Sequence, residues 1–242
     1  MLGIPDKYKL NKKFDVKTFI TSDLTPKEKK RIKETVIDVS LEYQLVGEEI
    51  PSLINEEYDC QAILFFSIKL STIKDASFVG GIIQKLGKPL YVLRFYDHTG
   101  VEAYYFARKR LNIQDKSQIV IEDAVITLPA SQQFEDEINS LMHEYSAFEK
   151  LKNRTNKLCL YLEIMVKSYI ISNTSLWSGS KTLLASKVWY NADDVISLFS
   201  KLKRVEQLKR EQKSTKTVSN SSKINSELKA IYAELGKYIG GL

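Results

Sequence analysis

The spacing of the apolar residues changes near Ser131, and this change constrains the fold more than any other feature of the sequence. Before it, short apolar runs separated by turn residues are typical of β-strands. After it, apolar residues recur every three or four positions, as they do on helices. We therefore expect an α+β protein with an α+β domain over 1–130 and a helical domain over 131–242.

The first regular element is expected to be a helix that follows an irregular N-terminal arm. Thr25 can cap this helix, Pro26 suits its first position, and Glu28 completes a capping box. An apolar stripe at helical spacing then extends the predicted helix to about five turns, through Ile32, Val36, Val39 and Tyr43.

The rest of the first domain is predicted to be a small, mostly antiparallel sheet with one crossover helix. The apolar run 60–70 indicates a strand that is buried on both faces. A short helix follows and ends near Gly87 and Pro89. The segments 90–96 and 101–107 flank the turn sequence DHTG and predict an antiparallel hairpin, and 119–128 is the last predicted strand.

The second domain is predicted to be helical throughout. The segment 132–151 is amphipathic, 155–170 is apolar around most of its circumference, and 191–211 begins with Asn191 as a cap. The polar stretch 213–223 is expected to be a loop at the tip of an antiparallel helical hairpin. The last helix carries an apolar stripe that fits either its own hairpin or a partner helix, made of Ile224, Leu228, Ile231 and Leu235.

Basic residues are concentrated in a few places, although the formal net charge is only +6. The stretch 201–216 holds seven Lys or Arg against two Glu, and Arg108–Arg110 and Lys12–Lys13 are further basic runs. Each such run is either a contact for DNA or another anionic partner, or a solvated end of an element. The candidate contact residues are Lys12, Lys13, Arg108, Lys109, Arg110, Lys203, Arg204, Lys209 and Arg210.

Signatures of common enzymes are missing from the sequence. It has no phosphate-binding glycine loop and no G-x-S-x-G, and the two histidines, His98 and His143, suit a turn and a helix surface. The two cysteines predict neither a disulfide framework nor a zinc site. We therefore name no catalytic residue, no metal ligand and no cofactor.

One enzymatic alternative is a degenerate or unusual metal-dependent nuclease. Restriction-type nucleases place one acid on or before a strand and an acid-x-Lys triplet on the next strand, and the acids hold the metal. Asp59 and Lys69, with Glu102, are the candidates here, but Ser67 stands where the triplet needs its acid.

The chain is expected to be cytoplasmic and not to contact a membrane. No apolar run approaches the roughly 20 residues that cross a bilayer, and the first residues do not have the order of a signal peptide.

Four segments, taken in order, resemble an uncharacterised bacterial family, a domain of unknown function. They are LNKKF, CQAILFFSIKLS, ARKRLN followed by IVIEDAVITL, and the tail KREQKSTKTVSNSSKINSELKAIYAEL. Members of that family are often encoded beside helicases of the type III restriction or Swi/Snf kind, with a DNA methyltransferase nearby, in anti-phage defence islands. Where the family has an acid, this chain has Ser67, and the resemblance supplies no catalytic residues.

What the resemblance implies is a role beside a DNA-processing machine. We expect a non-enzymatic accessory subunit that docks onto a helicase or methyltransferase partner and can also touch DNA. A stand-alone DNA-binding module is a further alternative, and self-association is left open.

Overall fold

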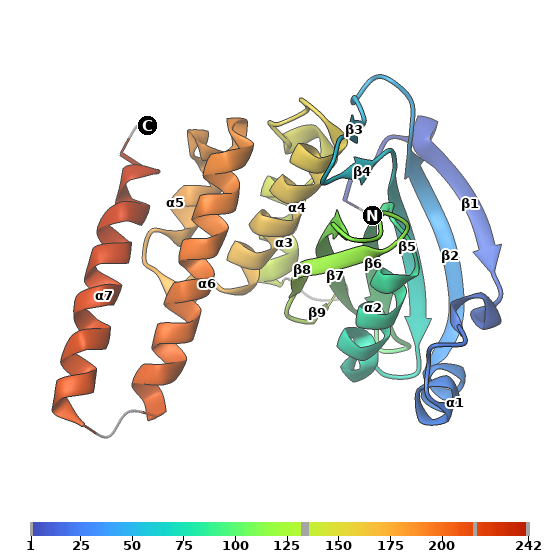
Figure 1. Ribbon diagram of the computed structural model, residues 1–242, viewed down its shortest axis with the longest axis horizontal. Coiled ribbons are helices and arrows are strands. Elements are labelled where there is room, and N and C mark those ends of the chain that lie inside the picture. The colour runs from blue at the N-terminus through green and yellow to red at the C-terminus, as the bar shows by residue number, and fades with distance from the viewer. Residues whose placement is uncertain (1, 132–135, 215–216, 241–242) are drawn as a thin grey trace. The chain divides into compact units, whose positions relative to one another are not determined.

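The computed structural model describes residues 2–131, 136–214 and 217–240 (Figure 1). They divide into two compact units, 1–169 and 170–242. This division does not coincide with the change of pattern near Ser131, because α3 and most of α4 pack within the first unit.

The first unit contains the sheet and its helices. Its regular elements are β1 (Lys9–Phe14), α1 (Pro26–Thr35), β2 (Val36–Leu45), β3 (Leu53–Ile54), β4 (Asp59–Cys60), β5 (Ile63–Leu70), α2 (Ala76–Ile83), β6 (Leu90–Tyr96), β7 (Val101–Leu111), β8 (Ile119–Ile126), β9 (Ala130–Ser131), α3 (Glu137–Tyr145) and the greater part of α4 (Lys157–Ser172). Short 3-10 helices at Asp6–Tyr8, Val16–Phe19 (η2), Ile73–Asp75, Gln84–Leu86 (η4) and Phe148–Lys150 join them.

In the described residues, seven strands form the main sheet, in the order β1-β2-β5-β6-β7-β8, with β9 paired to β7. All neighbours are antiparallel except β5 and β6, which are parallel and joined by α2. The hairpin of β6 and β7 turns at Asp97–Gly100, where Gly100 has a φ of 78°. The predicted α+β class, the mostly antiparallel sheet and its crossover helix are confirmed.

The predicted five-turn helix is half right. Thr25 and Glu28 form the expected capping box, but α1 ends at Thr35 and residues 36–45 form β2. Val36, Ile37 and Val39 are β-branched, which favours a strand. The apolar residues from Val39 to Leu45 also fit a spacing of two, which sequence reasoning took for helical spacing.

The N-terminal arm is not irregular. Residues 9–14 form β1, which pairs with β2 at the edge of the sheet. Its side chains are exposed except for the half-buried Phe14, so the strand lacks the alternation of buried and exposed residues that reveals most strands.

One face of the sheet packs against α1, α2 and η2. Ile32 of α1 and Val79 of α2 meet Phe66, Ile68 and other buried residues of the central strands in one apolar core. Alternate residues of each strand point to this core, and the residues between them point to the opposite face.

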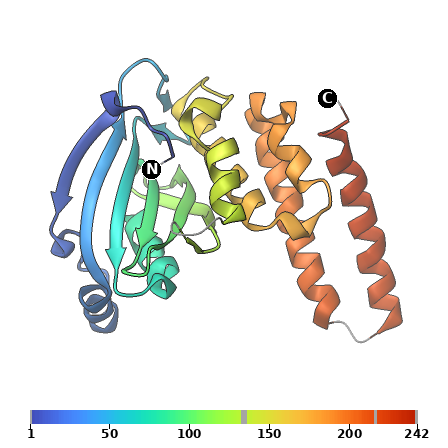
Figure 2. The same ribbon diagram turned by 180° about the vertical axis from the view of Figure 1, so that it is seen from behind.

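The opposite face is covered by α4 near β7, where Tyr161 contacts Phe106 edge to face. The Tyr161 hydroxyl accepts a hydrogen bond from Ala107 N (2.8 Å) and donates one to Tyr91 O (3.0 Å). It therefore bridges β6 and β7 where their direct pairing has ended. Figure 2 shows β1, β2 and β5 on this side of the sheet without a helix over them.

The second unit contains the end of α4 and the helices α5 (Ser180–Ala185), α6 (Ala192–Ser214) and α7 (Val218–Lys237), with short 3-10 helices at Thr174–Leu176 and Lys187–Tyr190. Asn191 caps α6 by accepting hydrogen bonds from Asp193 N (2.9 Å) and Asp194 N (3.3 Å). The helices α6 and α7 form the predicted hairpin. Residues 218–223, predicted as loop, are the first turns of α7, and 215–216 lie outside the described residues.

Candidate functional site

The basic run on β7 is engaged in ion pairs with the neighbouring strand. Arg108 Nη2 lies 2.8 Å from Asp123 Oδ2, and Arg110 Nε lies 3.1 Å from Glu122 Oε1. Both carboxylates belong to β8, and the four side chains are about one-fifth to one-quarter exposed. Two predicted contact residues therefore have their charge neutralised across the sheet.

Lys109, between these arginines, points to the other face and is buried. Its ammonium group donates to Gly87 O (3.1 Å) and Pro89 O (2.9 Å) and lies 3.8 Å from the centroid of the Tyr91 ring. Burial lowers the pKa of Lys109 well below its usual value. This lysine ties the segment before β6 to β7 and is not available to a partner.

The predicted cations of α6 are also engaged within the second unit. Arg204 pairs with Glu227 of α7 (2.7 Å), and the Glu227 carboxylate raises the Arg204 pKa. Arg210 pairs with Glu206, Lys203 lies 3.8 Å from Glu206, and Lys209 donates to Ser175 O. The local positive charge of α6 is therefore partly offset by acids on both helices of the hairpin.

The predicted partner-helix stripe on α7 faces α6. Ile224, Leu228 and Leu235 are buried, and Ile231 is half-buried. The helices α6 and α7 pack against each other, and the buried residues of α6 include Leu202 and Val205. The hairpin thus accounts for the stripe within the chain, and its use by a partner remains a prediction.

A second basic region escaped the sequence analysis. Residues 1–35 contain ten Lys or Arg against five Asp or Glu, which is the same local excess as in 201–216. The excess of basic residues can be read from the sequence. However, the ten cations are spread over 35 residues, and their longest consecutive run is Lys29–Arg31 in α1.

Unlike the cations of β7, these lysines are exposed. Among the described residues, no carboxylate lies within 4 Å of the ammonium groups of Lys12, Lys17, Lys27 and Lys33. Lys13 is 80% exposed and 3.7 Å from Asp38, and Lys30 is 76% exposed and 3.8 Å from Glu34. Of the predicted contact residues, Lys12 and Lys13 alone belong to this region.

The three candidate nuclease residues do not come together. Asp59 lies in the two-stranded sheet of β3 and β4 and pairs with Lys88 (3.3 Å). Lys69 and Glu102 lie in one cross-strand row of the main sheet, on either side of Tyr96. The acid in register with Lys69 on the other neighbouring strand is Asp38 of β2. In the described ranges, no three His, Cys, Asp or Glu side chains are grouped so as to hold a metal ion.

The cross-strand row that holds Lys69 belongs to a polar patch. The patch lies on the face of the sheet opposite α1 and α2, where no described helix covers β1, β2 and β5. At its centre, Arg94 Nε donates to Glu102 Oε2 (2.6 Å) and Arg94 Nη1 to Ser67 Oγ (3.3 Å). Asp38 and Lys69 are opposite each other on neighbouring strands. Asp38 with Lys69, and Arg94 with Glu102, are thus opposite charges on neighbouring strands, as in stabilising cross-strand pairs.

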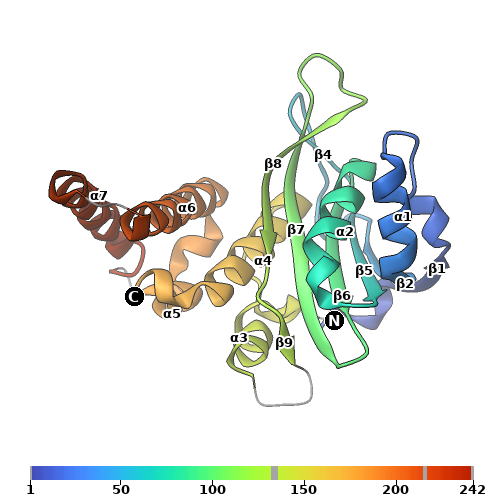
Figure 3. The same cartoon turned by 90° about the horizontal axis from the view of Figure 1, so that it is seen from below.

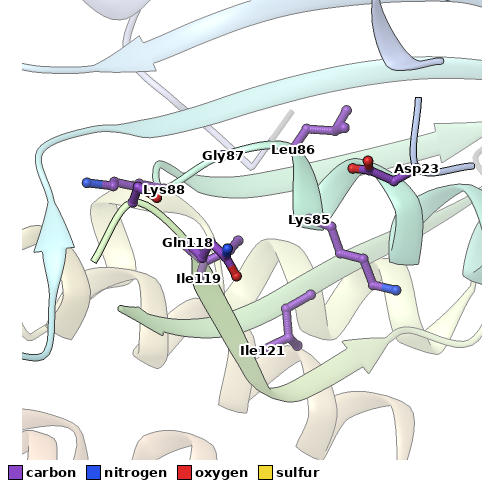
Figure 4. A pocket seen from close by; sticks show the side chains of 9 residues that line it. Asp23, Lys85, Leu86, Gly87, Lys88, Gln118, Ile119 and Ile121 are labelled. Atoms are coloured by element: carbon purple, nitrogen blue, oxygen red, sulfur yellow. The ribbon is translucent and has the colours of Figure 1, made fainter. Parts of the chain in front are cut away.

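A cleft of about 690 Å³ lies between residues 85–88 and the beginning of β8 (Figure 4). Ile119 and Ile121 form an apolar part of the cleft wall, and Gln118 lies between Lys85 and Lys88. Lys85 and Lys88 extend toward opposite ends of the cleft, and Lys88 is already paired with Asp59. The two cations therefore do not converge on one anionic group.

A smaller groove of about 300 Å³ lies at the far end of the β7–β8 hairpin, which projects from the sheet in Figure 3. We call it the tip groove; it is lined by Glu56, Glu57, Arg110, Leu111, Ile113 and Lys116. Ile113 is 82% exposed and Ile54, in the adjacent β3, is 64% exposed. Leu111 N donates to Glu57 O (2.8 Å), and Lys116 pairs with Glu56. These contacts join the end of the β7–β8 hairpin to the segment between β3 and β4.

The described helices include none with the length and apolarity to span a membrane. Both cysteines are free thiols, Cys60 buried and Cys159 half-buried.

Fold and surfaces define an α+β protein with separate exposed cationic and apolar regions. The chain matches the family model described as Domain of unknown function (DUF4391) over residues 2–235, and it belongs to this family. No match was found among curated proteins, and none among solved structures.

Proposed function

We propose that the chain is a non-enzymatic accessory subunit of a bacterial anti-phage defence or restriction-like system in the cytoplasm. In this proposal it docks onto a helicase or a DNA methyltransferase through the tip groove. The resemblance of its segments to proteins encoded beside such enzymes supports the choice of partner.

The observation that carries the docking proposal is the exposure of Ile113, in the loop between β7 and β8, and of Ile54, in the adjacent β3. Ile113 is more than four-fifths exposed and lines a groove, and such an apolar side chain gains free energy when a partner fills the groove and covers it. Glu57 is also exposed and, among the described residues, has no cation within 4 Å. The groove therefore suits an apolar side chain of the partner that is flanked by a Lys or Arg.

A tagged pull-down from the native host tests the proposal. The lysate is treated with nuclease, so that a partner held only through DNA is lost, and captured proteins are identified by mass spectrometry. We expect a helicase or a DNA methyltransferase with the wild-type chain, and its loss with Ile113→Asp.

Val218→Asp is the matched control, because Val218 is 88% exposed on α7. It should leave the partner bound. Absence of either enzyme from the wild-type capture, or equal capture by Ile113→Asp, would contradict the proposal.

A further inference from the structure

We infer that a lysine surface formed by β1, η2 and α1 binds the phosphate backbone of double-stranded DNA. We call it the N-terminal lysine surface and define it as Lys12, Lys17, Lys27, Lys30 and Lys33. The inference rests on the proposed function, which places the chain beside a DNA-processing enzyme, and it names a surface that does not include the basic run of β7.

The elements that carry these lysines are held together by aromatic contacts. The Lys12 ammonium lies 5.3 Å from the centroid of the Phe14 ring, and Phe14 contacts Phe19 of η2 at 6.2 Å between centroids. Phe19 in turn belongs to the apolar core that Ile32 of α1 enters. The three elements that carry the lysines thus pack on one apolar core at one edge of the sheet, where Figure 3 shows α1 beside β1 and β2.

Helix geometry places the lysines of α1 on its outer side. Ile32 and Thr35 are the buried residues of the helix, and Lys27 and Lys30 lie about 140–160° around the axis from Ile32. Lys27, Lys30 and Lys33 follow one another at intervals of about 4.5 Å along the axis. A DNA strand presents one phosphate per roughly 3.4 Å of its helix axis, so the charges of the two are spaced on a similar scale.

Among the described residues, four of the five lysines of this surface have no carboxylate within 4 Å, and Lys30 is in an exposed pair with Glu34; the arginines of β7 and α6 make the contrast. Arg108, Arg110, Arg204 and Arg210 each pair with a carboxylate of the same unit. A cation without a carboxylate neighbour can neutralise a phosphate and release the counterions condensed on the DNA, whereas a paired cation must first give up its carboxylate partner.

The character of the surface favours DNA over a lipid bilayer. Proteins that bind membrane surfaces add apolar or aromatic side chains that enter the bilayer beside their cations. Here Phe19 is buried and Phe14 is half-buried under Lys12, so the aromatic residues do not project, and Leu10 (47% exposed) is the one exposed large apolar side chain of β1, η2 and α1. Lysine point charges without exposed aromatic rings suit backbone contact that is independent of sequence.

The test is DNA binding as a function of salt. The full chain is titrated into a fluorescein-labelled 20-base-pair duplex of arbitrary sequence, and the association constant is measured by anisotropy from 50 to 200 mM NaCl. Each lysine that neutralises a phosphate adds about 0.9 to the slope of log K against log salt. We therefore expect Lys27→Gln/Lys33→Gln to lower the magnitude of the slope by about 1.8.

Lys223→Gln/Lys229→Gln is the matched control. It removes two exposed lysines from a helix, and neither has a carboxylate within 4 Å in the described part of the chain. It should leave the slope unchanged. Far-UV circular dichroism and thermal unfolding confirm that both variants fold.

Three outcomes would overturn the inference. They are no binding of the duplex by the wild-type chain at 50 mM NaCl, an equal loss of slope in both double variants, and binding to vesicles of phosphatidylserine and phosphatidylcholine at a salt concentration that abolishes DNA binding. None of these depends on the pull-down from nuclease-treated lysate, so the docking proposal and the DNA-binding inference fail separately.

Discussion

Lys167 and Glu163 form an ion pair in the interior of the first unit, one turn apart on α4, with 2.5 Å between Lys167 Nζ and Glu163 Oε1. Both side chains are almost fully buried. The Glu163 carboxylate also accepts hydrogen bonds from Lys152 N and Asn153 N, and Lys167 donates to Tyr145 O (3.0 Å). The pair therefore fixes the segment between α3 and α4 to the helix that packs on the sheet.

Removing the charge of Glu163 should destabilise the protein strongly. Glu163→Gln leaves the Lys167 ammonium buried without a counter-charge, and breaking a buried pair in this way costs about 3–5 kcal/mol. Urea denaturation measures the loss. Lys167→Met should cost less, because the carboxylate keeps its two backbone donors, and a larger loss in Lys167→Met would contradict this order.

Replacement of Lys109 should affect folding and not partner binding. In Lys109→Ala the carbonyl groups of Gly87 and Pro89 lose their donor, at about 1–3 kcal/mol for each buried group that stays unsatisfied. Arg110→Gln removes a charge that is one-quarter exposed and should cost about 1 kcal/mol or less. Equal unfolding midpoints in urea for the two variants would show that Lys109 is not a structural residue.

The glycine pair of α2 offers a packing test with a built-in control. A Cβ added at Gly80 would lie 2.6 Å from the Tyr105 ring, whereas one at Gly81 would have no atom nearer than the Tyr105 hydroxyl, at 3.8 Å. Gly80→Ala should therefore cost about 1–3 kcal/mol through overpacking. Gly81→Ala should gain about 0.5–1 kcal/mol from helix propensity. Thermal unfolding of both variants decides, and a stabilised Gly80→Ala would refute the close contact.

Alkaline pH should destabilise the native state partly through Tyr58. Burial raises the pKa of Tyr58 to about 12, from an ordinary value near 10. The unfolded chain therefore releases this proton at lower pH than the folded chain, so the contribution is complete below pH 10 and is lost between about pH 10 and 12. Tyr58→Phe should flatten the fall of unfolding free energy across that window, measured in urea at pH 9, 10 and 11. An unchanged slope would mean that Tyr58 titrates normally in the folded protein.

Only one of the two thiols should react in the native state. Burial raises the pKa of Cys60 to about 12, so its thiolate is scarce at pH 8, and the side chain is buried. Cys159 is half-buried and should supply the native reaction with Ellman's reagent. Cys159→Ser should abolish that reaction and Cys60→Ser should preserve it, and the reverse pattern would contradict the burial of Cys60.

Local sequence predicted those elements whose signals are carried by neighbouring residues. The capping box of Thr25 and Glu28, the turn at Asp97–Gly100 and the Asn191 cap each depend on a few consecutive residues, and all three appear as expected. Where local signals conflicted, the prediction failed. Residues 36–45 satisfy both a helical and an alternating spacing, and pairing with β1 and β5 selects the strand.

The roles of the basic residues were harder to predict, because whether a cation is paired, buried or exposed depends on residues that are distant in sequence. The sequence by itself determined the α+β class, the crossover helix, the helical hairpin and the positions of the basic runs. Only the tertiary structure decided that Arg108 and Arg110 pair with acids of β8, that Lys109 points into the core, and that the lysines of β1 and α1 stay exposed. The physical reason is that strand register and the alternation of side chains about a strand set which charges meet, and register is a property of the assembled sheet.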